Sequence, residues 1–449
     1  MEMLIKDPSK LLDDAVRYNA HKLYKDAQQR HVDLETYYEK GTLLDKLDRP
    51  IANYCAYISD VAVGYFLGKP VRYTVAKEYK KQLEKVQSVL DENDEHDHNK
   101  TLGIDQSVHG RSYELLYMNE DAKIKFTDIK PWEVVLVFDT TAAKNKIGAF
   151  RFVRQKDYTT QQAIEKTHCF FYDKTRSIEY EVEGDTFTEL SNTEHYFGEV
   201  PVIEYASNNN LIGDFERVVP LINAYNDSQT MTKIDMENFT NALLLIIGQM
   251  GTTTKDLNQI KEEGIAMLGA GGDARWLVKE INDQFIENYK NRLRKDIHTI
   301  SKTPDLTDEK FGGQQTGVAM EFKLWGLEQL TSTKESKFKA GLKERLRLII
   351  HILQIKGEQF DPDEIEIQFT RNIPANLLEI SQNIVSLKGL VSDETLLSQV
   401  PFVQDPAAEI EKNEAAREKL MDHYNFGPSP RSAHNTKPQD KQDAEQDDA

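Results

Sequence analysis

The chain has 449 residues, with 56 Lys and Arg, 75 Asp and Glu, and a formal net charge of −19. That length exceeds what one hydrophobic core usually fills, so several domains are expected. The acidity argues against a protein that binds by neutralising phosphates and against docking on an anionic membrane surface. The 2 cysteines are too few for a disulfide framework and lack metal-ligand spacing.

The N-terminal residues lack the apolar run of a signal peptide. The longest strongly apolar stretch, residues 242–247, is far shorter than the roughly 20 residues that a membrane span needs. The sequence therefore predicts a soluble protein made in the cytoplasm.

Residues 1–90 carry apolar side chains at three- and four-residue spacings, which predicts helices. Pro70 ends the second helical stretch, because proline lacks the N–H donor that a helix needs. Residues 71–75 then alternate like a strand, and a polar helix is predicted over 77–90. The acidic, histidine-bearing run 91–98 is predicted to be a solvated loop, with a metal site as the alternative.

Between residues 112 and 205 the apolar period changes to two, which is typical of β-strands. Turn residues separate the apolar runs at a spacing that favours an antiparallel meander over βαβ units. Neither a dinucleotide-binding fingerprint nor a P-loop is present. The predicted strands are 113–117, 134–138, 150–153, 169–172 and 178–182.

After residues 208–210 the chain becomes helical again, and the apolar pattern continues through Ile247 to Gly248. The turn-rich segment 251–281 follows, with a predicted strand at 276–278. A second helix is predicted over 282–304, with an apolar residue at every fourth position from Phe285 to Ile297. Its excess of basic residues is explained by a solvated face with intrahelical ion pairs or, alternatively, by a surface that meets a neighbouring subunit or a polyanion.

The polar, glycine-bearing connector 305–317 precedes a proline-free stretch, 318–356. As one helix, this stretch would be about 58 Å long at ~1.5 Å per residue, which is typical of a structural strut. A strand over 365–369 and three short helices are predicted next, the helices over 377–389, 393–398 and 407–421. The composition of residues 427–449 predicts disorder.

Candidate chemistry is sparse. The glycines at 269, 271 and 272 lack the downstream Lys-Ser/Thr of a phosphate-binding loop, so a flexible turn is predicted there. The histidines are scattered, and His298 and His351, on helical patterns, are expected to be satisfied core or interface residues. No catalytic residue, cofactor site or metal site is predicted.

Taken together, several stretches of the chain resemble the portal (head–tail connector) proteins of long-tailed double-stranded-DNA bacteriophages. The resemblance covers about residues 40–425 and rests on the order of its pieces. These are 53–54, Gly64-Tyr65-Phe66-Leu67-Gly68-Lys69-Pro70 with 71–73, Gly110-Arg111-Ser112-Tyr113-Glu114 with 115–117, 129–133, Phe197-Gly198-Glu199-Val200-Pro201 with 202–205, 208–210, 213–216, 221–226, Thr370-Arg371-Asn372-Ile373-Pro374 and 401–406.

The resemblance implies an α+β, mostly helical chain with the phage portal fold, whose subunits assemble as a ring, typically of twelve, at one capsid vertex. In that family double-stranded DNA is packaged and later ejected through the ring channel. The parts implied here are a wing (1–212), a stem helix (213–250), a clip (251–281), a second stem helix (282–304), a tunnel loop (305–317), the wing's long helix and strand (318–374), a crown (375–426) and a disordered acidic tail (427–449).

The resemblance also implies site residues. The tunnel loop facing DNA is Lys310, Phe311, Gly312, Gly313, Gln314, Gln315, Thr316 and Gly317. The stem, at the subunit interface, presents Phe285, Tyr289, Arg292, Leu293, Arg294 and Ile297, and the clip that docks partners presents Lys261, Glu262, Glu263, Arg275 and Trp276. Glycines give a loop the mobility that contact with moving DNA needs, and a floppy helix connector is the alternative interpretation of 311–317.

The implied partners are further copies of the chain, double-stranded DNA, the terminase large subunit, a head-completion adaptor, and the major capsid and scaffolding proteins, with no membrane. The implied location is the portal vertex of the virion, reached from the host cytoplasm. Two alternatives remain at this point. One is a cytoplasmic enzyme whose site is assembled from scattered carboxylates and histidines, and the other is a different ring-forming phage connector.

Overall fold

The computed structural model describes residues 1–44, 49–157, 164–240, 243–247, 273–277, 283–307, 317–358, 360–373, 377–400, 403 and 406–424. The chain forms two compact units, residues 1–372 and 373–449. The predicted disordered tail, 427–449, and the glycine-rich turn at 269–272 lie outside the described residues.

The strands of the first unit are β1 (Glu2–Ile5), β2 (Arg72–Thr74), β3 (Arg111–Met118), β4 (Ile124–Ile129), β5 (Val134–Asp139), β6 (Lys146–Asp157), β7 (Ile164–Tyr172), β8 (Arg176–Glu183), β9 (Thr186–Glu194), β10 (Val202–Ala206), β11 (Leu243–Ile247), β12 (Asp273–Leu277) and β13 (Glu366–Gln368). Its helices are α1 (Asp14–Lys40), α2 (Tyr54–Leu67), α3 (Lys80–Asp91), α4 (Glu95–His109), α5 (Val219–Thr240), α7 (Asp283–Ser301) and α8 (Gly317–Ile355), with short 3-10 turns at Pro8–Lys10, Lys77–Tyr79, Glu216–Val218 and Pro362–Glu364. The second unit contains α9 (Leu377–Leu387), α10 (Asp393–Ser398) and α11 (Pro406–Tyr424).

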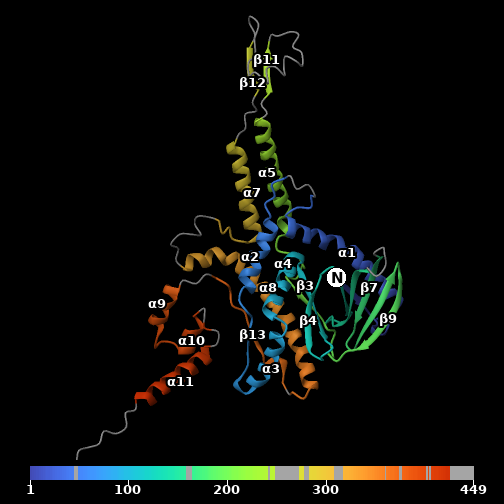
Figure 1. The fold of residues 1–449 in the computed structure, drawn as a ribbon, viewed down its shortest axis with the longest axis vertical. Helices are drawn as coiled ribbons and strands as arrows, with labels where there is room; N and C mark the ends of the chain where they lie inside the picture. Colours follow the sequence, from blue (N-terminus) through green and yellow to red (C-terminus); the bar gives the residue numbers. More distant parts are fainter. Residues whose placement is uncertain are drawn as a thin grey trace, which may run out of the picture. The chain divides into compact units, whose positions relative to one another are not determined.

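A six-stranded sheet, in the order β1-β5-β6-β7-β8-β9, forms one side of the first unit (Figure 1). Its strands from β5 to β9 are joined as an antiparallel meander, and β1 adds to β5 in parallel. Alternate residues of β8, namely Ile178, Tyr180 and Val182, face a core that includes Tyr24 of α1. The predicted meander is confirmed, and helices beside antiparallel sheets confirm the α+β class.

The helices have local start and stop signals. The Asn53 side chain accepts a hydrogen bond from the Ala56 N–H (3.0 Å) and caps α2. Gly110 ends α4 with φ of 77°. A Cβ at Gly110 would lie 2.3 Å from the Leu211 carbonyl oxygen, so a larger residue would be blocked by backbone as well as by its conformation.

A second core joins α2, α3 and α4, the sheet β10-β3-β4 and the C-terminal half of α8. Phe338, Leu342, Leu346 and Ile349 recur at helical spacing on α8 and are all buried in it. The long helix predicted over 318–356 is confirmed as α8. It serves as the strut against which the helices and strands of this core pack.

Arg345 lies fully buried on the same half of α8. Its guanidinium forms an ion pair with Glu114 of β3 (2.8 Å) and donates hydrogen bonds to Glu95 (3.1 Å) and Asn99 (3.0 Å) of α4. A buried cation costs several kcal/mol unless it is paired and hydrogen-bonded, and this geometry supplies both. Arg345 therefore fixes α8 to α4 and β3 at one register.

Glu114 is the carboxylate at the centre of this network. It contacts His98 Nε2 (2.8 Å) and accepts a hydrogen bond from the Tyr205 hydroxyl (2.7 Å). Burial acts to raise the pKa of Glu114, but the charge of Arg345 and the bond with His98 outweigh it and lower the pKa to about 2. The carboxylate is therefore ionised over the whole physiological pH range.

Two predicted elements have other bounds in the structure. The run 91–98 is not a loop throughout, because α4 begins at Glu95, where Tyr73, Asn99 and Arg345 bond the Glu95 carboxylate. The helix predicted over 213–250 ends at Thr240 in α5. Its apolar continuation, Leu243–Ile247, instead pairs antiparallel with β12, since a run of five apolar residues suits a strand as well as a helix.

Candidate functional site: the α5–α7 pair and the start of α8

Helices α5 and α7 run side by side and antiparallel (Figure 1). Ile297 of α7 is fully buried against Val218, in the 3-10 turn before α5, and against Ile222 in the first turn of α5, and Leu293 is 6% exposed. These two residues, predicted to lie at a subunit interface, belong to the core of their own chain. They are buried because the C-terminal half of the apolar stripe on α7 packs against the start of α5.

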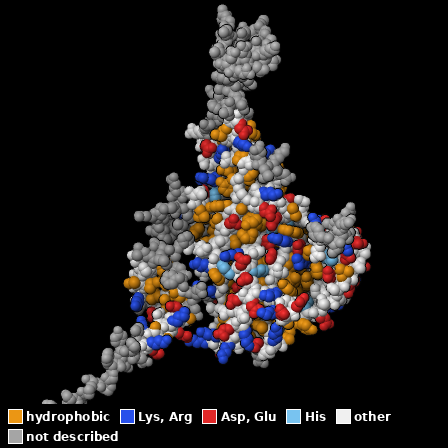
Figure 2. Space-filling model, in the orientation of Figure 1, with side chains coloured by type: hydrophobic (Ala, Val, Ile, Leu, Met, Phe, Trp, Pro, Cys, Tyr) orange, Lys and Arg blue, Asp and Glu red, His pale blue; other side chains and the backbone are white. Residues whose placement is uncertain are grey.

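The N-terminal half of the same stripe faces outward. Phe285 is 70% exposed and Tyr289 is 46% exposed. On α5, Met231 is 67% exposed and Ile234 is 48% exposed. Figure 2 shows hydrophobic side chains interspersed with charged ones over this pair of helices. The α5–α7 pair thus exposes large apolar side chains. Packing within one chain does not account for their presence on the surface, and such patches often mark interaction sites.

Charged residues of both signs surround these apolar side chains. Arg292 is 82% exposed and lies 3.9 Å from Asp296, whereas Arg294 lies 3.6 Å from Asp305. Exposed pairs at these distances contribute little to stability. Helix α7 carries four basic and three acidic residues, and α5 carries three acidic residues and one lysine, so the two helices differ in charge balance.

The chain after α7 is fixed to α2. The Tyr57 hydroxyl donates a hydrogen bond to the Pro304 carbonyl (2.9 Å) and accepts one from the Leu306 N–H (3.0 Å). The His298 ring packs edge-on against Tyr57 and Tyr54 and contacts the Thr303 carbonyl through Nδ1 (3.1 Å). His298 is therefore the satisfied core histidine that its helical pattern predicts.

Asp305 lies at the same corner. Partial burial acts to raise its pKa, but hydrogen bonds from Thr307 and the charges of His298 and Arg294 lower it. The carboxylate thus stays ionised beside α7. Asp305 is the first residue of the connector 305–317, of which the structure describes residues 305–307 and 317.

Helix α8 opens with two exposed aromatic residues. Phe322 is 76% exposed and Trp325 is 62% exposed, although the intervening Leu324 is buried. Neither residue was among the site residues predicted from the sequence. The sequence does carry a signal for an exposed aromatic face. Phe322 and Trp325 are three residues apart, shortly after the glycine-bearing connector, and helical spacing puts them on a different face from positions 324 and 327.

Most of the predicted loop and clip residues lie outside the described residues. This holds for Lys310, Phe311, Gly312, Gly313, Gln314, Gln315 and Thr316 of the tunnel loop and for Lys261, Glu262 and Glu263 of the clip. Gly317 is the first residue of α8. Arg275 and Trp276 lie in β12, opposite Leu245 and Leu244 of β11. Their roles stay predictions.

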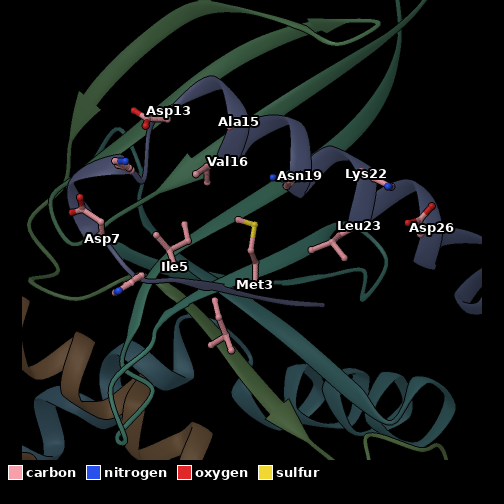
Figure 3. Close-up of a pocket in the computed structure, with 13 residues that line it drawn as sticks. Met3, Ile5, Asp7, Asp13, Ala15, Val16, Asn19, Lys22, Leu23 and Asp26 are labelled. Atoms are coloured by element: carbon pink, nitrogen blue, oxygen red, sulfur yellow. The ribbon is translucent and has the colours of Figure 1, made fainter.

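A surface cavity of about 1160 Å³ opens between β1 and α1 (Figure 3). Met3, Ile5, Val16 and Leu23 point toward one another inside it, and aspartates such as Asp26 lie at its rim with lysines. No histidine is among the residues that line it. The cavity does not assemble the imidazole–carboxylate set that the enzyme alternative requires.

Among the residues that the structure describes, no helix is both long enough and apolar enough to cross a bilayer.

Sequence comparison supplies the family. Residues 18–422 match the family model described as "Phage portal protein, SPP1 Gp6-like". The chain belongs to this family of phage portal proteins. The predicted resemblance is confirmed.

Two curated relatives carry the name portal protein. The one from Bacillus phage SPP1 is 24% identical over 383 residues, which cover 81% of this chain and 74% of the relative. The one from Clostridium phage phiCD119 is 20% identical over 398 residues, covering 83% of this chain and 86% of the relative.

Solved structures with similar chains come from gene transfer agent particles. A chain from the virion of a native particle is 12% identical, with 82% of this chain and 92% of that chain covered and a TM-score of 0.48. A chain from the neck of a native particle, computed with C12 symmetry, is 13% identical, with 77% and 88% covered and a TM-score of 0.45.

Proposed function

We propose that the chain is a subunit of a closed ring at one vertex of a phage capsid, and that double-stranded DNA passes through the ring during packaging and ejection. In this proposal the protein has no catalytic role of its own. The terminase large subunit and later a head-completion adaptor dock on the region of β11 and β12, and capsid and scaffolding proteins meet other faces. The ring assembles in the host cytoplasm and resides in the virion.

The observation that carries the ring is the set of exposed apolar side chains on three neighbouring segments. Trp325 and Phe322 on α8, Tyr289 on α7 and Met231 on α5 are all more than 40% exposed in one subunit. A heterologous contact, in which one face of a subunit meets a different face of the next, buries such residues. It closes into a ring when the rotation between neighbouring subunits divides a full turn. Aromatic residues of this kind supply much of the binding energy at interfaces.

The net charge of −19 agrees with a conduit for DNA. A protein that grips DNA neutralises phosphates with clustered lysines and arginines, and its lifetime on any one site is long. An acidic wall repels the phosphate backbone and keeps such lifetimes short, which suits a channel that DNA slides through. Multiplied over a ring, the repulsion is large, and the basic residues of α7 offset part of it.

Native mass spectrometry and electron microscopy of the purified protein test the proposal. We expect a closed ring with a central hole, of about twelve subunits as in the family. A chain that stays monomeric under all conditions, with a scaffolding partner included, contradicts the proposal. A monomer with a deep pocket that converges histidines and carboxylates would favour the enzyme alternative.

A further inference from the structure

Two helices of the first unit, α1 and α4, bring three metal-ligating side chains together. Glu35 lies on α1, and Asp105 and His109 lie one turn apart on α4. One donor atom from each residue lies within 4.8 Å of the other two. The spacing of Asp105 and His109, four residues apart, places both side chains on the same face of α4.

The cluster is shielded from water. Asp105 is 3% exposed and His109 is fully buried. The Oδ2 atom of Asp105 is sealed from solvent and has no hydrogen-bond partner. Buried carboxylate oxygens are normally hydrogen-bonded or bound to a cation, so this atom indicates an unfilled ligand position.

The surroundings of His109 are those of a metal ligand. Its Nε2 lies 2.9 Å from Glu35 Oε2, on the side of the carboxylates. Its Nδ1 lies 3.3 Å from Nδ1 of the buried His31, and the Trp132 ring packs edge-on against it at 5.5 Å. Ligating histidines usually hydrogen-bond through the second ring nitrogen, which fixes the ring and leaves the first nitrogen for the metal.

Lys130 is the cation now beside the carboxylates. Its Nζ lies 3.3 Å from Asp105 Oδ1 and 3.6 Å from Glu35 Oε1. The Lys130 side chain is 38% exposed, so it can turn toward solvent without leaving a buried charge behind. Lys130 therefore balances one of the two carboxylates and competes with any ion for them.

We propose that Glu35, Asp105 and His109 bind a divalent transition-metal ion of the Zn²⁺ class, with Lys130 displaced toward solvent. One imidazole and two carboxylates suit Zn²⁺, which then takes a water molecule as its fourth ligand. On binding, the neutral His109 ring coordinates the ion through Nε2 and carries its one proton on Nδ1, which donates to Nδ1 of His31. The bound ion fastens α1 to α4 and does not depend on the proposed ring or channel.

Zinc binding by the full chain tests the site. The protein is treated with EDTA, dialysed against Zn²⁺, and assayed for bound zinc by elemental mass spectrometry and for affinity by competition with a chelating dye. We expect one zinc per chain and a higher thermal midpoint with zinc than without. Asp105→Asn and Glu35→Gln should each weaken binding at least ~10–100-fold.

Zinc affinity and thermal stability of the Lys130→Met variant distinguish a metal site from a cluster that is only an ion pair. Removing the competing cation should tighten zinc binding, whereas a cluster that only needs Lys130 would lose thermal stability and gain no zinc affinity. His96→Gln, on the same helix but outside the cluster, is the control for adventitious binding to histidine and should leave the affinity unchanged.

Three results overturn the proposal. They are the absence of stoichiometric zinc in the wild-type chain, equal zinc affinity in the wild type and in Glu35→Gln, and unchanged or weaker affinity in Lys130→Met. Glu35 is partly exposed, so its variant is expected to fold, and circular dichroism confirms this before binding is measured.

Discussion

The two ends of α8 lie in opposite environments. The C-terminal half buries Phe338, Leu346 and the guanidinium of Arg345 inside its own chain, whereas Phe322 and Trp325 at the N-terminal end stand more than 60% exposed. The C-terminal half buries most of its large apolar side chains, with Ile355 at its very end as an exposed exception, and the N-terminal end presents aromatic rings to water. The C-terminal half of α8 therefore stabilises the fold of one subunit, and the exposure of the N-terminal end supports our proposal that this end makes contacts between subunits.

The largest effect is expected at the buried half. Arg345→Met should lower the free energy of unfolding by about 3–5 kcal/mol, because it leaves the Glu114 charge buried without its ion-pair partner. Chemical denaturation followed by circular dichroism measures the change. Arg347→Met is the matched control, since Arg347 is 46% exposed and lies 3.5 Å from Glu199. It should change stability by less than about 1 kcal/mol. Equal losses in both variants would show that the Arg345 network does not hold α8.

The exposed half is tested by Trp325→Glu. We expect each subunit contact to lose about 2–4 kcal/mol, as at interface hot spots, so that rings give way to monomers. Native mass spectrometry gives the subunit number, and the unfolding of the single chain should not change. Tyr196→Glu is the control, because Tyr196 is 64% exposed and lies outside α5, α7 and α8. If rings survive Trp325→Glu, or if Tyr196→Glu disrupts them equally, the N-terminal end of α8 does not make the subunit contacts that we propose.

Deletion of residues 312–316 probes the segment between α7 and α8, the two helices that flank it. We expect rings to form normally, because Tyr57 fixes the chain at Pro304 and Leu306, before the deletion. DNA packaging or retention should fall, as measured by protection of packaged DNA from nuclease. Failure of ring assembly in this variant would indicate that the segment is structural.

Acid should weaken the buried half of α8 selectively. The pKa of Glu114 is about 2 in the folded chain against an ordinary 4.5. A depressed carboxyl pKa adds stability that is present above the ordinary value and is lost as the pH falls from about 4.5 toward 2. Unfolding measured at several pH values should show a smaller acid loss in Glu114→Gln than in the wild type. In the control Glu120→Gln, at an exposed position, the unfolding free energy should fall with pH as it does in the wild type. If it falls equally in all three proteins, protonation of Glu114 is not the cause of the acid destabilisation.

The smallest effect is expected at the corner where α7 meets α2. Tyr57→Phe removes the hydroxyl that bonds Pro304 and Leu306, and it should cost about 1 kcal/mol of unfolding free energy. Denaturant titration measures it, with Tyr18→Phe on the surface as control. No difference between the two variants would mean that the Tyr57 hydroxyl does not anchor the connector.

Local patterns predicted most of the elements. The period-two strands, the proline-free helix and the glycine-bearing connector were all visible in the sequence, because hydrophobic periodicity and breakers act over a few residues. The same local rules failed at residues 243–247 and at Glu95. In both places the neighbouring pattern is ambiguous, and distant partners, β12 in one case and Arg345 in the other, decide the outcome.

The family, the α+β class and the amphipathic character of α7 could all be predicted from the sequence. Three features needed the three-dimensional structure. They are which half of the apolar stripe on α7 is buried, why an arginine lies among the leucines of α8, and the contact of Glu35 with His109, 74 positions away in the chain. Burial and charge pairing depend on contacts between residues far apart in the chain. A local pattern therefore shows that a face is apolar or charged, but it does not show what covers that face.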